Sequence, residues 1–425
     1  MPKNLDAALS RRTTGRAAWL LGPAMVAGVA YLDPGNVASN MTAGAVFGYL
    51  LVWVVVLGNV MAWLIQYLSA KLGIVTGESL PQLLGRRIRR PWARRAYWLQ
   101  AELVAMATDV AEVIGGAVAL NLLFGIPLLW GGAITGVVSI VLLMVQSRRG
   151  ARAFETVVIG LLVIIAVGFS AGLFFAPPDP AGVVGGLVPR FEGATSVLLA
   201  ASILGATIMP HAIYAHSALS RDRFAPSEPP GAAGLEAARG VSTARLLRAT
   251  RWDVTIALAV AGTVNLAILL LAAANLTGVD GTDSLEGAYA ALRDGLGATI
   301  ATLFAVGLLA SGLASTSVGA YAGAEIMHGL LRVRVPLLTR RLVTLIPALV
   351  ILAVGIDPTL ALVLSQVVLS FGIPFALIPL VALTARRDVL GAHRNRALTT
   401  AAGVLAAVFL VALNTLLLWL VFTGG

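Results

Sequence analysis

The chain has 425 residues, of which 58% are hydrophobic and only 12% charged, and its mean hydropathy is +0.90. No soluble domain of this size would show such a composition, which therefore indicates an integral membrane protein. The net charge of +10 raises the question of nucleic-acid binding, which the placement of the charges answers below. The absence of cysteine excludes disulfides and thiolate metal sites.

Eleven apolar runs, each about the length of a transmembrane helix, follow one another along the chain. The first is too long for a cleavable signal peptide and is followed at once by another, so we expect it to remain as an anchor. We expect one membrane domain over residues 1–425, with a flexible cytoplasmic linker at about 220–251. The predicted spans are 18–43, 48–70, 97–123, 127–146, 154–176, 195–219, 253–275, 297–324, 340–356, 359–384 and 398–422.

The basic residues gather on alternate connections between these spans. With eleven spans, 28 of the 30 Lys and Arg residues fall on the side of the N-terminus, and only Arg190 and Arg293 fall on the other. This is the positive-inside pattern, which predicts a cytoplasmic N-terminus and an external C-terminus. The positive charge therefore reports topology and attraction to anionic lipid headgroups, and we expect no nucleic-acid partner.

Two spans are interrupted at their centres by helix-breaking sequences. Asp33-Pro34-Gly35-Asn36 lies in the first span, and residues 206–211, Ala-Thr-Ile-Met-Pro-His, lie in the sixth. Unwound backbone at membrane depth must line a cavity or be buried in protein, and a carboxylate there is costly enough to indicate a function. Each break lies in the first span of a possible five-span unit, at about 18–176 and 195–384, with an extra helix at about 398–422. The paired breaks predict a transporter's substrate site.

The two breaks carry groups that can bind a divalent cation. The first half-helices end with free carbonyls near Ala30 and Ala206, where the helix dipole is negative. The Asp33 carboxylate, the Asn36 amide and the Met209 thioether add further ligands. Oxygen ligands with one soft sulfur favour manganese, iron, cobalt and cadmium over magnesium and calcium. Two alternatives stay open, because Asn36 could cap the second half-helix and Met209 could fill the core.

A separate group of charged residues is suited to carrying protons. Glu102, Asp109 and Glu112 recur at i, i+7 and i+10, which places them on one face of the third span. Three carboxylates on a membrane helix are costly unless paired or hydrated, so we interpret them as a proton route. Arg340 and Arg341 in the ninth span are candidate partners; alternatively, they mark the cytoplasmic end of that span.

The motifs at the two breaks resemble those of the Nramp family of divalent-metal transporters, in particular its bacterial manganese branch. The resemblance rests on residues 33–36 and 205–211 together with Tyr214, His216 and Ser217, and it covers nearly the whole chain, including 68–73, 100–109 and 364–367. It implies an all-α membrane protein with an inverted five-plus-five repeat, the LeuT-like architecture, plus one extra helix. It also implies proton-coupled uptake of manganese and ferrous iron across a bacterial cytoplasmic membrane.

The resemblance also assigns roles to single residues. It implies that His211 flanks the metal site and that His216 belongs to a polar network on the inner side, although either histidine could be purely structural. The two are five residues apart, so they cannot form the i, i+4 pair of a zinc helix. The metal ligands implied are Asp33, Asn36, Met209 and the carbonyls of Ala30 and Ala206, with Gln366 joining in some conformations.

Two other functions are alternatives to metal import. An organic-solute symporter, for example of amino acids, would present half-helix N-termini to a substrate carboxylate, and the anionic Asp33 opposes this. A membrane scaffold or sensor would have no reason to bury Asp33 and the third-span acids. No nucleophile–base constellation or nucleotide loop indicates an enzyme. We expect a monomer without a cofactor, whose partners are divalent metal ions, protons and membrane lipid.

Overall fold

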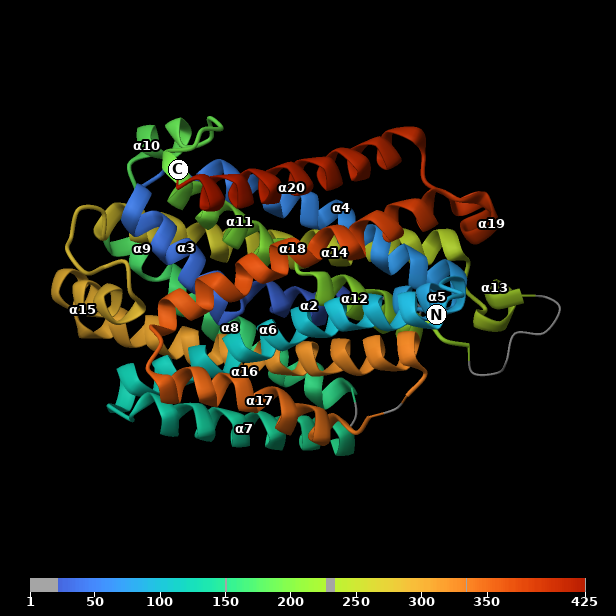
Figure 1. Ribbon diagram of the computed structural model, residues 1–425, viewed down its shortest axis with the longest axis horizontal. Coiled ribbons are helices and arrows are strands. Elements are labelled where there is room, and N and C mark those ends of the chain that lie inside the picture. Colours follow the sequence, from blue (N-terminus) through green and yellow to red (C-terminus); the bar gives the residue numbers. More distant parts are fainter. Residues whose placement is uncertain (1–21, 150, 227–233, 334, 425) are drawn as a thin grey trace, which may run out of the picture.

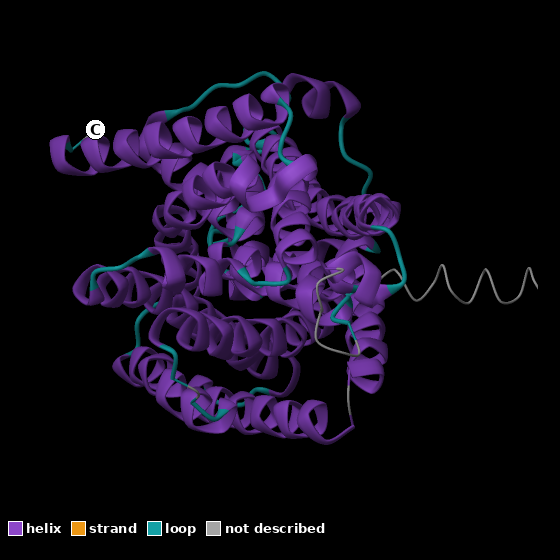
Figure 2. Ribbon diagram, turned by 90° about the vertical axis from the view of Figure 1, so that its right-hand side faces the viewer, coloured by secondary structure: helices purple, strands orange, loops and turns teal. Residues whose placement is uncertain are grey.

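The computed structural model describes residues 22–149, 151–226, 234–333 and 335–424, and within them it contains helices and connections but no strand (Figure 2). Among these residues, seven helical segments are long and apolar enough to cross a membrane. They are α4 (Val52–Thr76), α6 (Pro91–Phe124), the consecutive α11 (Gly193–Ile208) and α12 (Pro210–Arg223), α14 (Thr243–Asn275), α16 (Ala298–Leu331), α18 (Pro358–Ala385) and α20 (Ala397–Thr423). The protein is therefore an all-helical, multi-span membrane protein.

The other predicted spans also contain helices. The first holds α2 (Pro23–Val29), the 3₁₀ turn η1 (Ala30–Leu32) and α3 (Pro34–Phe47), while its residues 18–21 lie outside the described part of the chain. The remaining three hold α7 (Leu128–Arg149), α8 (Ala151–Ser170) with α9 (Gly172–Phe175), and α17 (Leu337–Val354). All eleven predicted spans thus contain helix, and the number that crosses the membrane stays a prediction.

The short helices divide between the two ends of the bundle (Figure 1). One end carries α5 (Leu80–Arg87), α13 (Gly234–Arg239), α19 (Arg387–Leu390) and the 3₁₀ turn η2 (Gly391–His393); we call it the basic end, because the Arg-rich connections lie there. The opposite end carries α10 (Pro180–Gly185) and α15 (Leu285–Leu296). This division matches the predicted alternation of the connections.

Helices extend into both ends of the linker predicted at about 220–251. Helix α12 continues to Arg223, α13 occupies 234–239 and α14 begins at Thr243, while residues 227–233 lie outside the described part. Charged residues at the basic end continue the membrane helices beyond the apolar core, so low hydropathy there does not mark the end of the helix. The flexible, cytoplasmic character of the linker stays a prediction.

The two interrupted helices lie in the interior of the bundle. In α11–α12, 94% of the most apolar 18-residue stretch is buried. In α20, which lies on the periphery, the corresponding value is 33%. The start of α2 is capped by a residue of another helix. The Asp253 carboxylate of α14 accepts hydrogen bonds from the N–H groups of Gly22 (3.1 Å) and Ala24 (2.9 Å). This carboxylate satisfies N–H groups at the start of α2 that would otherwise lack partners.

Candidate functional site

The first break separates two half-helices at Asp33. Its backbone is extended (φ −69°, ψ 162°), and its carboxylate accepts a hydrogen bond from the N–H of Asn36 at 2.8 Å, which caps α3. Pro34 follows at the first helical position, where its fixed φ and missing N–H suit the start of a helix. The sequence Asp-Pro-Gly-Asn thus ends one helix and starts the next within a single span.

Proline also explains why two carbonyls are available at the breaks. In a regular helix, the N–H of residue 34 would bond to the carbonyl of Ala30, and the N–H of residue 210 to the carbonyl of Ala206. Pro34 and Pro210 have no N–H to donate, so neither carbonyl receives its i+4 hydrogen bond. The two alanines predicted as ligands are those whose carbonyls the prolines leave free of that bond.

The second break is centred on Met209. This residue has a φ of +29°, one of only two positive values outside glycine among the described residues, and its side chain is fully buried. A positive φ is unfavourable for a residue with a side chain, and such strain gathers at functional positions. Met209 is therefore held in an unusual conformation where α11 ends and α12 begins.

Gln366 of α18 lies against both breaks. Its Nε2 donates to Asp33 Oδ2 at 3.1 Å, while its Oε1 is buried without a hydrogen-bond partner among the described residues. A Cβ atom on Gly35 would lie 1.7 Å from that Nε2, and one on Gly205 would lie 1.9 Å from the Gln366 backbone oxygen. Only glycine at both positions lets α18 approach the two breaks this closely.

All six predicted metal-site residues are closed off from solvent. Asp33, Asn36, Ala206, Met209 and Gln366 have no exposed surface, and Ala30 is 1% exposed. Among the described residues, no three His, Cys, Asp or Glu side chains cluster as a metal site, and the predicted ligand set uses only one carboxylate. A cation can reach these groups only when the surrounding helices move.

The N-cap of α3 is Asp33 and not Asn36, whose side chain instead forms hydrogen bonds on both sides of the break. Its Oδ1 accepts from Asn40 Nδ2 at 2.6 Å, and its Nδ2 donates back across the break to the Tyr31 carbonyl, which also accepts from Asn265 Nδ2 at 3.0 Å. The hydroxyl of Ser311 donates to the next carbonyl, that of Leu32. The unwound turn is thus stabilised by side chains of three helices.

The acids of the third span and the two arginines form one buried cluster. Arg340 contacts Glu102 (3.1 Å) and Asp109 (3.3 Å), and Arg341 contacts Asp109 (2.8 Å) and Glu112 (3.1 Å). The two arginines are thus paired with the third-span acids, and they also lie in the first turns of α17; their part in a proton route stays a prediction. All five side chains are 10% exposed or less.

The two histidines join different groups. His211 lies two residues beyond Met209, and its Nδ1 is 3.1 Å from the hydroxyl of Thr108, the neighbour of Asp109 in α6. His216 lies a turn nearer the basic end, where its Nδ1 is 2.8 Å from Gln66 Oε1 of α4. The structure therefore places His211 between the second break and the acid–arginine cluster, and His216 in a separate polar contact.

The sequence of the chain matches that of a known family over most of its length. The family described as Nramp, natural resistance-associated macrophage protein-like, matches residues 24–420. The "Divalent metal cation transporter MntH" of Mycobacterium tuberculosis (strain CDC 1551 / Oshkosh) is 60% identical over 420 residues, covering 99% of this chain and 96% of that protein.

Solved structures agree with this match. The manganese transporter of Eremococcus coleocola, in complex with an aromatic bis-isothiourea substituted compound, superposes with a TM-score of 0.80 at 32% identity, covering 94% of this chain and 85% of that one. MhsT in complex with L-phenylalanine shares the fold alone, with a TM-score of 0.58 at 13% identity over 95% of this chain and 98% of that one. On these grounds, the chain belongs to the Nramp family.

Proposed function

We propose that this protein is a proton-coupled importer of divalent transition-metal ions, chiefly Mn²⁺ and also Fe²⁺, Co²⁺ and Cd²⁺. The observation that carries the proposal is the buried Asp33 carboxylate at a helix break, beside carbonyls that prolines have freed. The relatives named as divalent metal cation transporters support it, as does family membership. Substrate binds at the two breaks, and alternating access exposes them to each side in turn.

The ligand set explains the class of cation. Asp33, Asn36, Gln366 and the carbonyls of Ala30 and Ala206 supply oxygens, and Met209 is proposed to supply the single sulfur. A thioether adds little for magnesium or calcium and more for later, softer divalent ions. The Gln366 amide now directs its nitrogen at Asp33, so coordination through its oxygen requires the amide to turn over.

The charge count of the buried cluster supports proton transport. Among the described residues, Glu102, Asp109 and Glu112 form ion pairs with two cations, Arg340 and Arg341, so with all three acids ionised one negative charge has no counter-charge there. An uncompensated charge inside a membrane protein is costly, and one proton would remove it. We assign the proton pathway to Asp33, this cluster, His211 and His216.

A second function, organic-solute symport, is favoured by one observation only. The fold is shared with MhsT, whose structure holds L-phenylalanine. At 13% identity this likeness carries the fold and not the substrate. A carboxylate at the first break would repel the carboxylate of an amino acid, which is why we place this function second.

The proposed setting is a bacterial cytoplasmic membrane, with the basic end in the cytoplasm, the N-terminus inside and the C-terminus outside. We propose a monomer built from two inverted five-span repeats, about 18–176 and 195–384, followed by the extra helix at 398–422. The paired breaks in α2–α3 and α11–α12 support the repeat.

Uptake of labelled Mn²⁺ by Asp33→Asn tests the site. Because an amide is cheaper to bury than a carboxylate, the variant should reach the membrane at near-parent levels while uptake is abolished. Asp280→Asn, which removes an exposed acid from a connection, is the matched control and should transport like the parent. Uptake by Asp33→Asn at anything near the parent rate would exclude Asp33 as a metal ligand.

A further inference from the structure

A basic cavity lies at the basic end, remote from the metal site. It has a volume of about 610 Å³ and is lined by Lys71 of α4, Arg248 and Arg251 of α14, and Arg394 and Arg396 from the connection that precedes α20. No acidic residue lines it, and none of these five side chains has an ion pair among the described residues. Five cations around one hollow repel one another, so an anion would stabilise them.

Lys71 is the most constrained of these cations. It is only 6% exposed, and its ammonium donates to Asn395 Oδ1 at 2.9 Å, a neutral partner that Thr384 holds in place. An ammonium has three donors, and a buried charge without a counter-ion is costly. The Arg251 guanidinium is fixed over the Tyr67 ring, 5.3 Å from its centroid.

The residues around the cavity indicate that it lies at the level of the membrane–water interface. Trp252 and Leu398, the sequence neighbours of Arg251 and Thr399 in the cavity wall, are 64% and 82% exposed. Tryptophan is typical of the membrane–water interface. Arginine and lysine at that level bind phosphate groups through charge-assisted hydrogen bonds.

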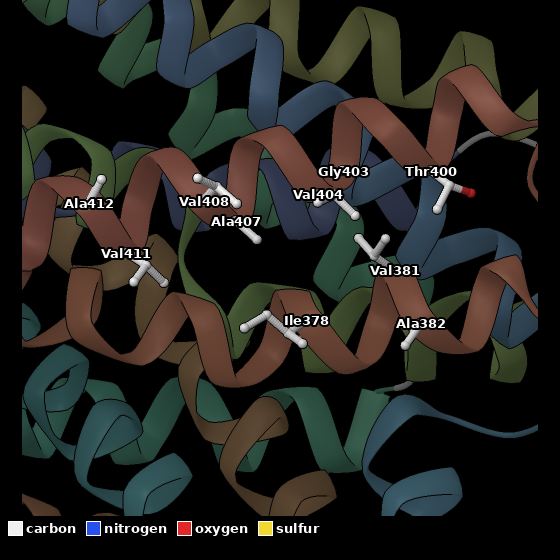
Figure 3. Close-up of a pocket in the computed structure, with 10 residues that line it drawn as sticks. All are labelled: Ile378, Val381, Ala382, Thr400, Gly403, Val404, Ala407, Val408, Val411 and Ala412. Carbon is white, nitrogen blue, oxygen red and sulfur yellow. The ribbon is translucent and has the colours of Figure 1, made fainter.

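Apolar surface suited to acyl chains begins at the same end of α20. A groove of about 540 Å³ runs between α18 and α20, where aliphatic side chains such as Ile378, Val381 and Val404 face each other (Figure 3). Thr400 lines this groove, and its neighbour Thr399 lines the basic cavity. A phospholipid would contact both the basic cavity and the apolar groove, whereas a soluble phosphate would contact the basic cavity alone.

We propose that the basic cavity binds the phosphate headgroup of an anionic phospholipid from the leaflet at the basic end. The headgroup phosphate offsets part of the repulsion among the five cations, and the bound lipid links α4, α14 and the start of α20. Because α4 lies in the first proposed repeat, α14 in the second and α20 outside both, the lipid would stabilise their relative positions. This binding does not depend on which substrate the protein transports.

Native mass spectrometry of the purified full-length protein in detergent tests the proposal. The protein is offered phosphatidylglycerol or phosphatidylcholine with identical acyl chains, and in a third arm inorganic phosphate alone. We expect the parent to retain phosphatidylglycerol preferentially. Arg394→Gln/Arg396→Gln should weaken that binding by about tenfold or more, since each cation at a membrane surface contributes on the order of 1 kcal/mol.

The matched control is Arg89→Gln/Arg90→Gln, which removes the same charge from an exposed connection at the same end without touching the cavity. It should bind phosphatidylglycerol like the parent. Equal loss in both double variants, or equal retention of the two lipids by the parent, would show a general charge effect and overturn the proposal. Binding of inorganic phosphate that depends on Arg394 and Arg396, without binding of phosphatidylglycerol, would assign the cavity to a soluble anion instead.

Discussion

Asp109 is the residue that joins the two arginines, because its two carboxylate oxygens contact Arg340 and Arg341 separately. Asp109→Asn leaves two carboxylates and two guanidiniums in the cluster, so their charges balance. We therefore expect the variant to fold and bind metal while its uptake loses most of its dependence on pH. Binding of Cd²⁺ by calorimetry and uptake of Mn²⁺ at several pH values would measure the two properties separately.

Arg341→Gln provides the contrast, because it leaves three carboxylates with one guanidinium. Breaking a buried ion pair from the cationic side should destabilise the protein by about 3–5 kcal/mol, measured as a lower midpoint of thermal unfolding.

For Asp109, one outcome would contradict the prediction. An Asp109→Asn variant that keeps the parent's pH profile but loses Cd²⁺ binding would instead place Asp109 in the metal site.

Met209 tests the proposed selectivity. Met209→Ala removes the one soft ligand of the proposed site, so Cd²⁺ uptake should fall more than Mn²⁺ uptake, and millimolar Mg²⁺ or Ca²⁺ should begin to compete. A loss of about 1.4 kcal/mol in discrimination would be a tenfold change in competition. Met41→Ala is the matched control, since Met41 is a buried methionine of α3 outside the breaks. Identical competition curves in parent and Met209→Ala would make Met209 a packing residue.

Packing between elements depends on Gly205, where α11 meets α18. A Cβ atom there would lie 1.9 Å from the Gln366 carbonyl oxygen, a backbone atom that no rotamer change can move. Gly205→Ala should therefore force the helices apart, lower stability by roughly 1–3 kcal/mol and impair uptake. Gly160→Ala in α8 is the control, because its Cβ would meet nothing within 4 Å. Equal unfolding midpoints for the two variants would contradict this close approach.

The positions of the helices were predictable at this scale, whereas the contacts around the breaks were not. Hydropathy locates apolar spans, so each predicted span contains helix, but α14 begins at Thr243, ten residues before its span, because its charged first turns lie outside the apolar region. Short amphipathic helices such as α15 carry no apolar run long enough to detect.

At the site, the local signals were the helix breakers and the charges, which identified Asp33, Met209 and the acids of α6. The groups that complete the first break come from distant segments. Ser311 and Asn265 bind carbonyls of the unwound turn from more than 230 residues away, and Gly205 matters only through its approach to Gln366. Asn265 is a polar residue in an apolar span, but its hydrogen-bond partner depends on tertiary packing, which a single sequence does not record.

For the whole molecule, the structure contains two buried groups of residues: the proposed metal ligands around the two breaks, and the acid–arginine cluster of α6 and α17 to which we assign proton transport. The proposed metal ligands are closed to solvent. Thr108, the neighbour of Asp109 in the acid–arginine cluster, contacts His211, which lies two residues beyond Met209. A cation that enters beside Asp33 adds positive charge near the cluster, which favours release of a proton. We therefore expect any coupling of the two ions to depend on both groups of residues and not on either group alone.

The most direct test of this coupling is the movement of both ions in one preparation. Purified protein is reconstituted into liposomes that contain a pH-sensitive dye, and Mn²⁺ is added outside at acidic and at neutral pH. We predict that Mn²⁺ entry acidifies the lumen, that entry is faster at acidic external pH, and that Asp33→Asn abolishes both signals. Mn²⁺ entry without any proton flux, or with equal rates at the two pH values, would contradict proton-coupled import.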